Sequence, residues 1–144
     1  MIKTLADVVK IVESSGNTFA IRYEPALYAT KPAWAISQLQ NIKNINKCSD
    51  PTALMISCTS FGAWQLLGVN IYSMGYKLPI AQYLQDETAQ LSSALELMKS
   101  MGFDGNADFS SFTFPELLHF AQKWNGPGNF SNYAYALLHA GNNT

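Results

Sequence analysis

Two glutamates, Glu13 and Glu24, are the residues of this chain whose type and spacing best suit acid–base chemistry. They lie near the two ends of the stretch IVESSGNTFAIRYEP, although only 10 of the 144 residues are Asp or Glu. Two carboxylates that flank a cleft are the minimum equipment for hydrolysing a glycosidic bond. One must hold a proton for the leaving oxygen, while the other stays ionised to stabilise positive charge or to activate water.

The local sequence predicts different roles for the two acids. Glu13 falls in the last turn of an expected helix with an apolar face, where burial and the helix C-terminus both favour the neutral acid. Glu24 ends an alternating segment beside Arg22, which favours the ionised form. The residues alone also allow a plainer reading. A Glu near a helix end is commonly solvated, and a surface Arg22–Glu24 pair contributes under about 1 kcal/mol.

The elements that must position these acids are a helix and a short strand. Thr4 is a suitable N-cap with Asp7 three residues on, and Gly16 suits the left-handed residue that ends a helix. The helical face is apolar, at Ile2, Leu5, Val8, Val9 and Val12. Alternation of apolar and polar residues over 19–24 predicts a strand, and its connection at 17–18 is compatible with a small hairpin.

The rest of the chain predicts helices, and a mostly α fold of the loose α+β class. In the first half, helices are expected at Pro32–Gln40, from the Ser49 cap through Cys58 (a buried helix), and at Phe61–Leu67. In the second half, one is expected from Asp86 to Gly102, and a second is capped by Thr113 and Glu116 and ends at Gly126. The last is expected from about Ser131 to Ala140.

Composition limits the classes of partner. A chain of 144 residues with 48% hydrophobic and 13% charged residues is expected to form a single domain over 1–144. A net charge of −1 argues against nucleic acid as a partner, and no apolar run is long enough for membrane insertion. The cysteines and histidines have no metal-ligand spacing, so neither a metal nor a cofactor is expected. The N-terminus has no apolar leader, which favours free thiols at Cys48 and Cys58 and synthesis in the cytoplasm.

Two later segments contain side chains suited to binding sugars. In TSFGAWQLLGVNIYSMGY, Ser60 lets a backbone approach closely, and Gln65 and Asn70 can bond hydroxyl and acetamido groups. Three aromatic residues there are able to stack on sugar faces: Trp64, Tyr72 and Tyr76. In WNGPGNFSNYAYALL, the rigid Gly-Pro-Gly turn projects Asn125. A core helix with aromatic packing, and a plain joint between two helices, are the alternative interpretations of these segments.

Taken in order, three blocks resemble a known family. VESSGNTFAIRYEPALY, SDPTALMISCTSFGAWQLLGVNIYSMGY and KWNGPGNFSNYAYALL are similar to the opening, central and closing motifs of the peptidoglycan N-acetylmuramidase domain of bacteriophage endolysins. That domain belongs to the lysozyme-like superfamily, with lytic transglycosylases and goose-type lysozymes. The resemblance extends from about Leu5 to Ala140. It implies a lysozyme-like helical domain with a small β-hairpin near the N-terminus.

The resemblance also implies roles for individual residues. Glu13 would be the general acid, and three residues would line the glycan groove: Ser60, Gln65 and Asn125. Glu24 matches the strand acid of the family, but lytic transglycosylases work with a single Glu, so its role stays open. Trp124 stands where the family has Tyr, and the histidine expected after Glu24 is absent.

The implied activity is cleavage of the bond between N-acetylmuramic acid and N-acetylglucosamine in bacterial peptidoglycan, after release through holin-made membrane holes or from a virion. Three alternatives stay open. They are a lytic transglycosylase that forms 1,6-anhydro ends, a non-catalytic glycan-binding or phage structural module, and an unrelated helical interaction protein.

Overall fold

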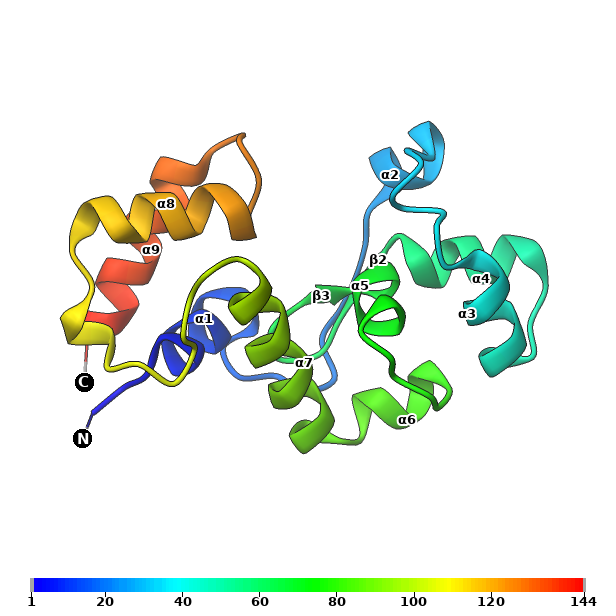
Figure 1. Cartoon of the computed structure of the whole chain (residues 1–144), viewed down its shortest axis with the longest axis horizontal. Helices are drawn as coiled ribbons and strands as arrows, with labels where there is room; N and C mark the ends of the chain where they lie inside the picture. The colour runs from blue at the N-terminus through cyan, green and yellow to red at the C-terminus, as the bar shows by residue number, and fades with distance from the viewer. Residues whose placement is uncertain (1, 144) are drawn as a thin grey trace.

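Helices dominate the fold of residues 2–143, which the computed structural model describes (Figure 1). The helices are α1 (Leu5–Ser14), α2 (Pro25–Thr30), α3 (Leu39–Asn46), α4 (Asp50–Ser57), α5 (Gly68–Ser73), α6 (Ile80–Leu84), α7 (Glu87–Ser100), α8 (Phe114–Trp124) and α9 (Phe130–Asn142), with a 3-10 turn at Phe109–Ser111. Three short strands, β1 (Ile21–Tyr23), β2 (Thr59–Phe61) and β3 (Leu66–Leu67), form one antiparallel sheet. The predicted mostly helical fold with a small β element is confirmed.

The ends of α1 and α8 follow from their capping residues. Thr4 and Asp7 exchange hydrogen bonds of 2.9 and 3.1 Å at the start of α1, and Thr113 and Glu116 do the same at the start of α8. Helix α1 ends when Ser15 adopts a φ of 55°, one residue before the predicted Gly16. Glu13 therefore lies in the last turn of α1, as expected.

The sheet corrects one expectation, because the segment Phe61–Leu67 is not a helix. β1 pairs with β2, with Ile21 opposite Phe61, and β2 returns through a tight turn into β3. Gly62 has a φ of 85° and Gln65 a φ of 54°, which a helix does not accommodate. A Cβ on Gly62 would lie 2.6 Å from the Gln90 side chain, so the turn requires glycine there.

Three further helix predictions are wrong in detail. The helix expected over 32–40 is replaced by α2 before it and by α3, which begins only at Leu39. Helix α4 is not buried on all sides, since Met55 is 48% exposed. Helix α9 continues through Gly141 because this glycine packs against Phe109, whose ring carbon would lie 2.1 Å from an added Cβ.

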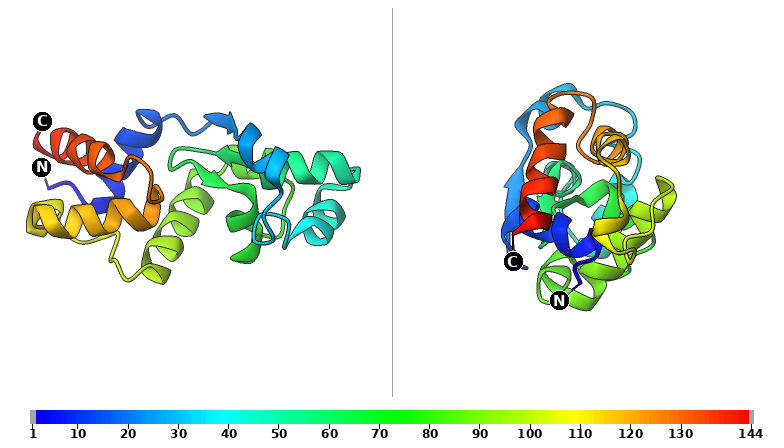
Figure 2. Two further views of the ribbon diagram at one scale, coloured as in Figure 1. Left: turned by 90° about the horizontal axis from the view of Figure 1, so that it is seen from above. Right: turned by 90° about the vertical axis from the view of Figure 1, so that its left-hand side faces the viewer.

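The molecule has two parts along its long axis (Figures 1 and 2). Helices α1, α8 and α9 lie at one end together with both termini, the sheet and α2–α6 lie at the other, and α7 lies between them. One buried core runs through both parts, with Leu5 and Phe120 on one side and Phe61 and Tyr83 on the other. Cys48 and Cys58 are not paired. Within residues 2–143, no helix has the length and apolar character needed to span a bilayer.

Candidate active site

A groove of about 510 Å³ lies where the two parts of the molecule meet. One wall, which we call the helical wall, is formed by Glu13 at the end of α1, by Leu97 and Met101 of the α7 region and by residues 123–126 at the C-terminal end of α8. The other, which we call the sheet wall, comes from β1, β2, β3, α2, the α2–α3 connection and α5. Its lining residues are Arg22, Glu24, Leu27, Trp34, Ser60, Gln65, Leu66, Leu67 and Asn70.

Glu13 is held in the helical wall by two aromatic hydrogen-bond donors. The Trp124 indole N–H donates to Glu13 Oε2 at 3.1 Å, and the Tyr133 hydroxyl donates to the same oxygen at 2.5 Å. Oε1 has no hydrogen-bond partner among residues 2–143. With Oε2 occupied as an acceptor twice, Oε1 is the oxygen on which a proton of the neutral acid would sit.

Burial raises the pKa of Glu13 above its ordinary value of 4.5. The hydrogen bonds from Tyr133 and Trp124, and then the positive charge of Arg22, act in the opposite direction but do not cancel the desolvation. Burial also raises the pKa of Tyr133 well above 10.0, so its hydroxyl stays a donor over the whole physiological range. The expected shift toward a neutral Glu13 is supported, and burial is its main cause.

The end of α1 is hydrogen-bonded to the turn of the sheet. The Ser14 hydroxyl donates to the Ala63 carbonyl at 2.7 Å, in the turn between β2 and β3. That turn is held in place from α7, because the buried Gln90 carboxamide accepts from the Ala63 N–H at 2.9 Å. On the other side of Glu13, the Trp124 ring stacks on Phe120 at 5.5 Å. Glu13 is therefore fixed from both walls.

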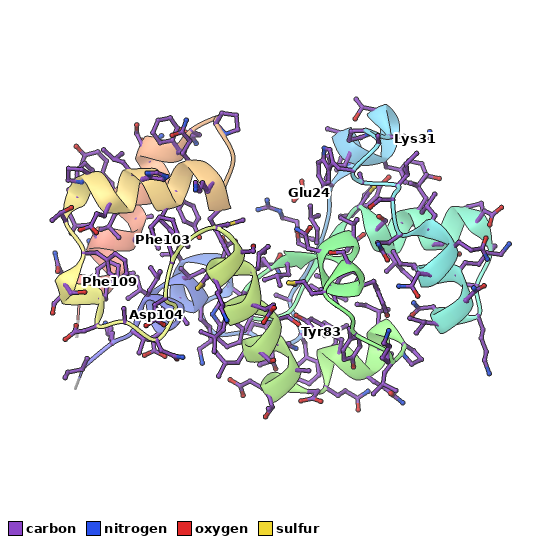
Figure 3. All side chains as sticks on the ribbon, in the orientation of Figure 1. Glu24, Lys31, Tyr83, Phe103, Asp104 and Phe109 are labelled. Carbon is purple, nitrogen blue, oxygen red and sulfur yellow. The ribbon has the colours of Figure 1, made fainter. Side chains whose placement is uncertain are left out.

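Glu24 lies in a more open setting, on the side of the sheet that faces α8 (Figure 3). Alternation along β1 places Arg22 and Glu24 on the groove side, and Arg22 Nε donates to Glu24 Oε1 at 2.9 Å. The Glu24 side chain is 29% exposed, against 74% for Arg22. The second carboxylate is thus bound to a cation at the groove surface.

Four other predicted residues line the same groove, namely Ser60 on β2, Gln65 before β3, Asn70 on α5 and Asn125 at the end of α8. Gln65 already uses its side-chain N–H₂ group within the protein, on the Ala20 and Gly62 carbonyls at 3.0 and 2.9 Å. Its carbonyl oxygen is therefore the atom it can offer a ligand. Contact of each of these residues with sugar stays a prediction.

Tyr76 does not lie with them, and this corrects its expected place in the groove. Its ring packs edge-on against Tyr83 at 5.1 Å and lies tilted against Tyr72 at 6.0 Å, after the chain turns at Gly75 with a φ of 97°. Trp64 and Tyr72 are also core residues, only 3% and 1% exposed. The Trp64 indole N–H donates to the Ala6 carbonyl at 2.8 Å, so it fastens α1 and cannot stack on a sugar.

Three aromatic features were not predicted from the sequence: the hydrogen bonds of Trp124 and Tyr133 to Glu13, and the place of Trp34 in the groove. Tyr133 is far from Glu13 along the chain, and only its place in the closing block WNGPGNFSNYAYALL hinted at a role. Trp34 is 52% exposed, and no pattern in the sequence around it indicated this exposure.

A carboxyl group whose pKa is raised by burial, in a groove lined by amides, a hydroxyl and an ion-paired second carboxylate, is the arrangement that glycosidases use. Comparison with known proteins agrees, because the family model for N-acetylmuramidase matches residues 22–143. The chain belongs to the N-acetylmuramidase family, a class of glycoside hydrolases. Glu13 lies ahead of the matched segment, so the match does not cover this residue.

A relative is known from a phage. The chain is 42% identical over 93 residues to the endolysin of Enterobacteria phage PRD1. The matched segment spans 62% of this chain and 62% of the length of that endolysin. No solved structure matches the chain.

Proposed function

We propose that the chain hydrolyses the glycan strand of bacterial peptidoglycan between N-acetylmuramic acid and N-acetylglucosamine, with Glu13 as the general acid. The observation that carries this is the enclosed Glu13 carboxyl, whose Oε2 accepts two hydrogen bonds while Oε1 has no partner within residues 2–143. Membership of the N-acetylmuramidase family supports the substrate class.

In this proposal the proton moves from Glu13 Oε1 to the glycosidic oxygen as the bond to the anomeric carbon breaks. The leaving sugar departs as a neutral alcohol, and Glu13 becomes a carboxylate. Tyr133 and Trp124 then donate to that carboxylate, which strengthens both hydrogen bonds as charge develops. Water completes the reaction by adding to the positively charged sugar, and its proton returns to Glu13 or passes to solvent.

Glu24 supports the positive sugar electrostatically or activates that water. Its ion pair with Arg22 keeps the carboxylate in one orientation on the groove surface. The same ion pair also favours a second candidate, a lytic transglycosylase, since a carboxylate engaged by arginine is a weaker base than a free one. In that reaction the sugar closes on its own hydroxyl and leaves a 1,6-anhydro end.

The test is digestion of purified peptidoglycan by the wild type and by Glu13→Gln. The amide oxygen of glutamine can still accept from Trp124 and Tyr133, but the side chain cannot deliver a proton. Glu96→Gln is the matched control, because Glu96 is exposed on α7 and outside the groove. Fragment release should disappear only with Glu13→Gln. Equal release by both variants would remove Glu13 from the mechanism.

Mass spectrometry of the same digest separates the candidates. Reducing muramic acid ends support hydrolysis, whereas 1,6-anhydro ends support the transglycosylase. A chain that is pulled down by peptidoglycan but releases no fragment is the non-catalytic module. Action on the cell wall fits the phage endolysin that resembles this chain, and release by a holin or delivery in a virion is part of the same proposal.

A further inference from the structure

The α2–α3 connection places a tryptophan at the edge of the groove, and we propose that this residue, Trp34, is a stacking platform for a pyranose ring of the glycan strand. The proposal deepens the function proposed above and rests on it. Trp34 lines the groove and is 52% exposed, whereas Trp64 is 3% exposed in the core and Trp124 is occupied by Glu13. Among the described residues, Trp34 is the tryptophan that is open to a ligand.

The backbone beside Trp34 is anchored, so its exposure is built into the fold. The next residue, Ala35, is fully buried in a small cluster with Leu54 and Cys58. The buried Ser57 hydroxyl donates to the Ala35 carbonyl, and the Ala35 N–H donates to the Pro32 carbonyl at 2.9 Å. A turn held at residue 35 by α4 presents residue 34 outward, and a residue on a rigid turn binds with little loss of conformational entropy.

The chemistry of the indole suits a sugar. One face of a pyranose ring consists of C–H groups, which pack on the flat face of an aromatic ring, while the hydroxyl groups at the ring edge stay hydrated. The indole N–H of Trp34 has no partner within residues 2–143, so it can donate to a hydroxyl. Leu27 lies in the same wall and adds apolar surface.

The position of Trp34 indicates from which wall it contacts the strand. Glu13 is at the end of α1 in one part of the molecule, and the α2–α3 connection belongs to the other part, displaced along the long axis (Figures 1 and 2). Trp34 would therefore contact the glycan strand from the wall opposite Glu13. The enzyme should then act better on long strands than on short fragments, because only long strands reach both residues.

The closing experiment measures binding of soluble, peptide-free glycan strands from purified peptidoglycan, in the Glu13→Gln background to prevent turnover. Trp34→Ala should weaken binding about tenfold or more, and Trp34→Phe should retain most of it. Phe19→Ala is the control, because Phe19 is 63% exposed and does not line the groove. Strands should also protect tryptophan fluorescence from acrylamide quenching, and this protection should be smaller in Trp34→Phe, where Trp124 is the tryptophan that still lines the groove.

Kinetics with otherwise wild-type protein complete the test. Trp34→Ala should raise KM for long strands and leave kcat close to the wild type, a split that a general loss of folding would not produce. Unchanged binding and KM in Trp34→Ala, in a protein that releases peptidoglycan fragments, would overturn the platform and leave the proposed function intact. A wild type that neither binds strands nor releases fragments would overturn both.

Discussion

The two walls of the groove hold their carboxylates in opposite ways. In the helical wall, the half-buried Glu13 accepts from Trp124 and Tyr133 at Oε2, and burial raises its pKa. In the sheet wall, Glu24 is partly exposed and bound to the mostly exposed Arg22. The helical wall therefore favours a proton on its carboxyl, whereas the sheet wall favours a charge on its own.

This difference explains how one groove can contain two glutamates, one in surroundings that favour the protonated form and one in surroundings that favour the ionised form. Aromatic side chains from α8 and α9 cover part of the half-buried Glu13 and supply two donors to its carboxyl group. The strand β1 instead carries its acid beside a cation, two residues away on the same face. The same residue type thus acquires two chemical characters from its surroundings.

The largest expected effect comes from exchanging the acids for amides. Glu13→Gln should reduce kcat on peptidoglycan by about 10²–10⁴-fold, the usual contribution of a general acid. Glu24→Gln should cause a smaller loss, because its role can be shared by water or by the acetamido group of the substrate. Steady-state release of reducing ends measures both. A larger loss for Glu24→Gln than for Glu13→Gln would reverse the assignment of the two walls.

The next effect comes from the two aromatic donors. Tyr133→Phe and Trp124→Phe should each lower kcat roughly tenfold to a hundredfold, since each removes a hydrogen bond that strengthens as Glu13 becomes charged. Both bonds lower the pKa of Glu13, so their removal should raise it further. The alkaline limb of the pH–rate profile should therefore move to higher pH in both variants, and a downward move would contradict this account.

Features that depend on residues close in sequence could be predicted. They are the capping boxes, helix α1 and the position of Glu13 in the last turn of α1. Thr4 with Asp7, and Thr113 with Glu116, each satisfy a helix end within one turn. The strand β1 was predictable from its alternation, but its partner was not. β2 and β3 have only three and two residues, and they depend on distant partners, since β1 pairs with β2 and Gln90 accepts from Ala63 in the turn between them.

The site was predictable in part for the same reason. Side chains that project from a recognisable motif, such as Asn125 after the last turn of α8, do line the groove. Tyr76 shares a segment with Asn70 but packs into a tyrosine cluster after the turn at Gly75, which no local pattern specifies. Trp34 is exposed because its neighbour Ala35 is buried against α4, and that contact is tertiary.

A third effect concerns stability and its dependence on pH. Because the folded protein raises the pKa of Glu13 above 4.5, the folded state binds a proton more tightly than the unfolded chain. The wild type should lose stability as pH rises from 4.5 through the raised pKa. Glu13→Gln cannot ionise, so it should unfold at a higher Tm than the wild type near pH 7. Thermal unfolding from pH 4 to 8 should show this difference shrinking as pH falls, and a constant difference would contradict the linkage.

The smallest effect comes from the bond that joins the walls. Ser14→Ala removes the hydroxyl that donates to the Ala63 carbonyl and should lower the free energy of unfolding by about 1 kcal/mol. Urea denaturation of Ser14→Ala measures it, with Ser15→Ala as a control at a neighbouring exposed residue. An equal loss in both variants would show that the joint between the walls adds nothing specific.

The central claim is that Glu13 keeps its proton where an ordinary glutamate would lose it. The most direct measurement is a ¹³C NMR titration of the Glu13 carboxyl in the wild-type protein, with its resonance assigned by its absence in Glu13→Gln. The account predicts a midpoint above 4.5, because burial outweighs the two hydrogen bonds and Arg22. A midpoint at or below 4.5 would contradict it, since Glu13 would then be ionised across the range in which the enzyme must donate a proton.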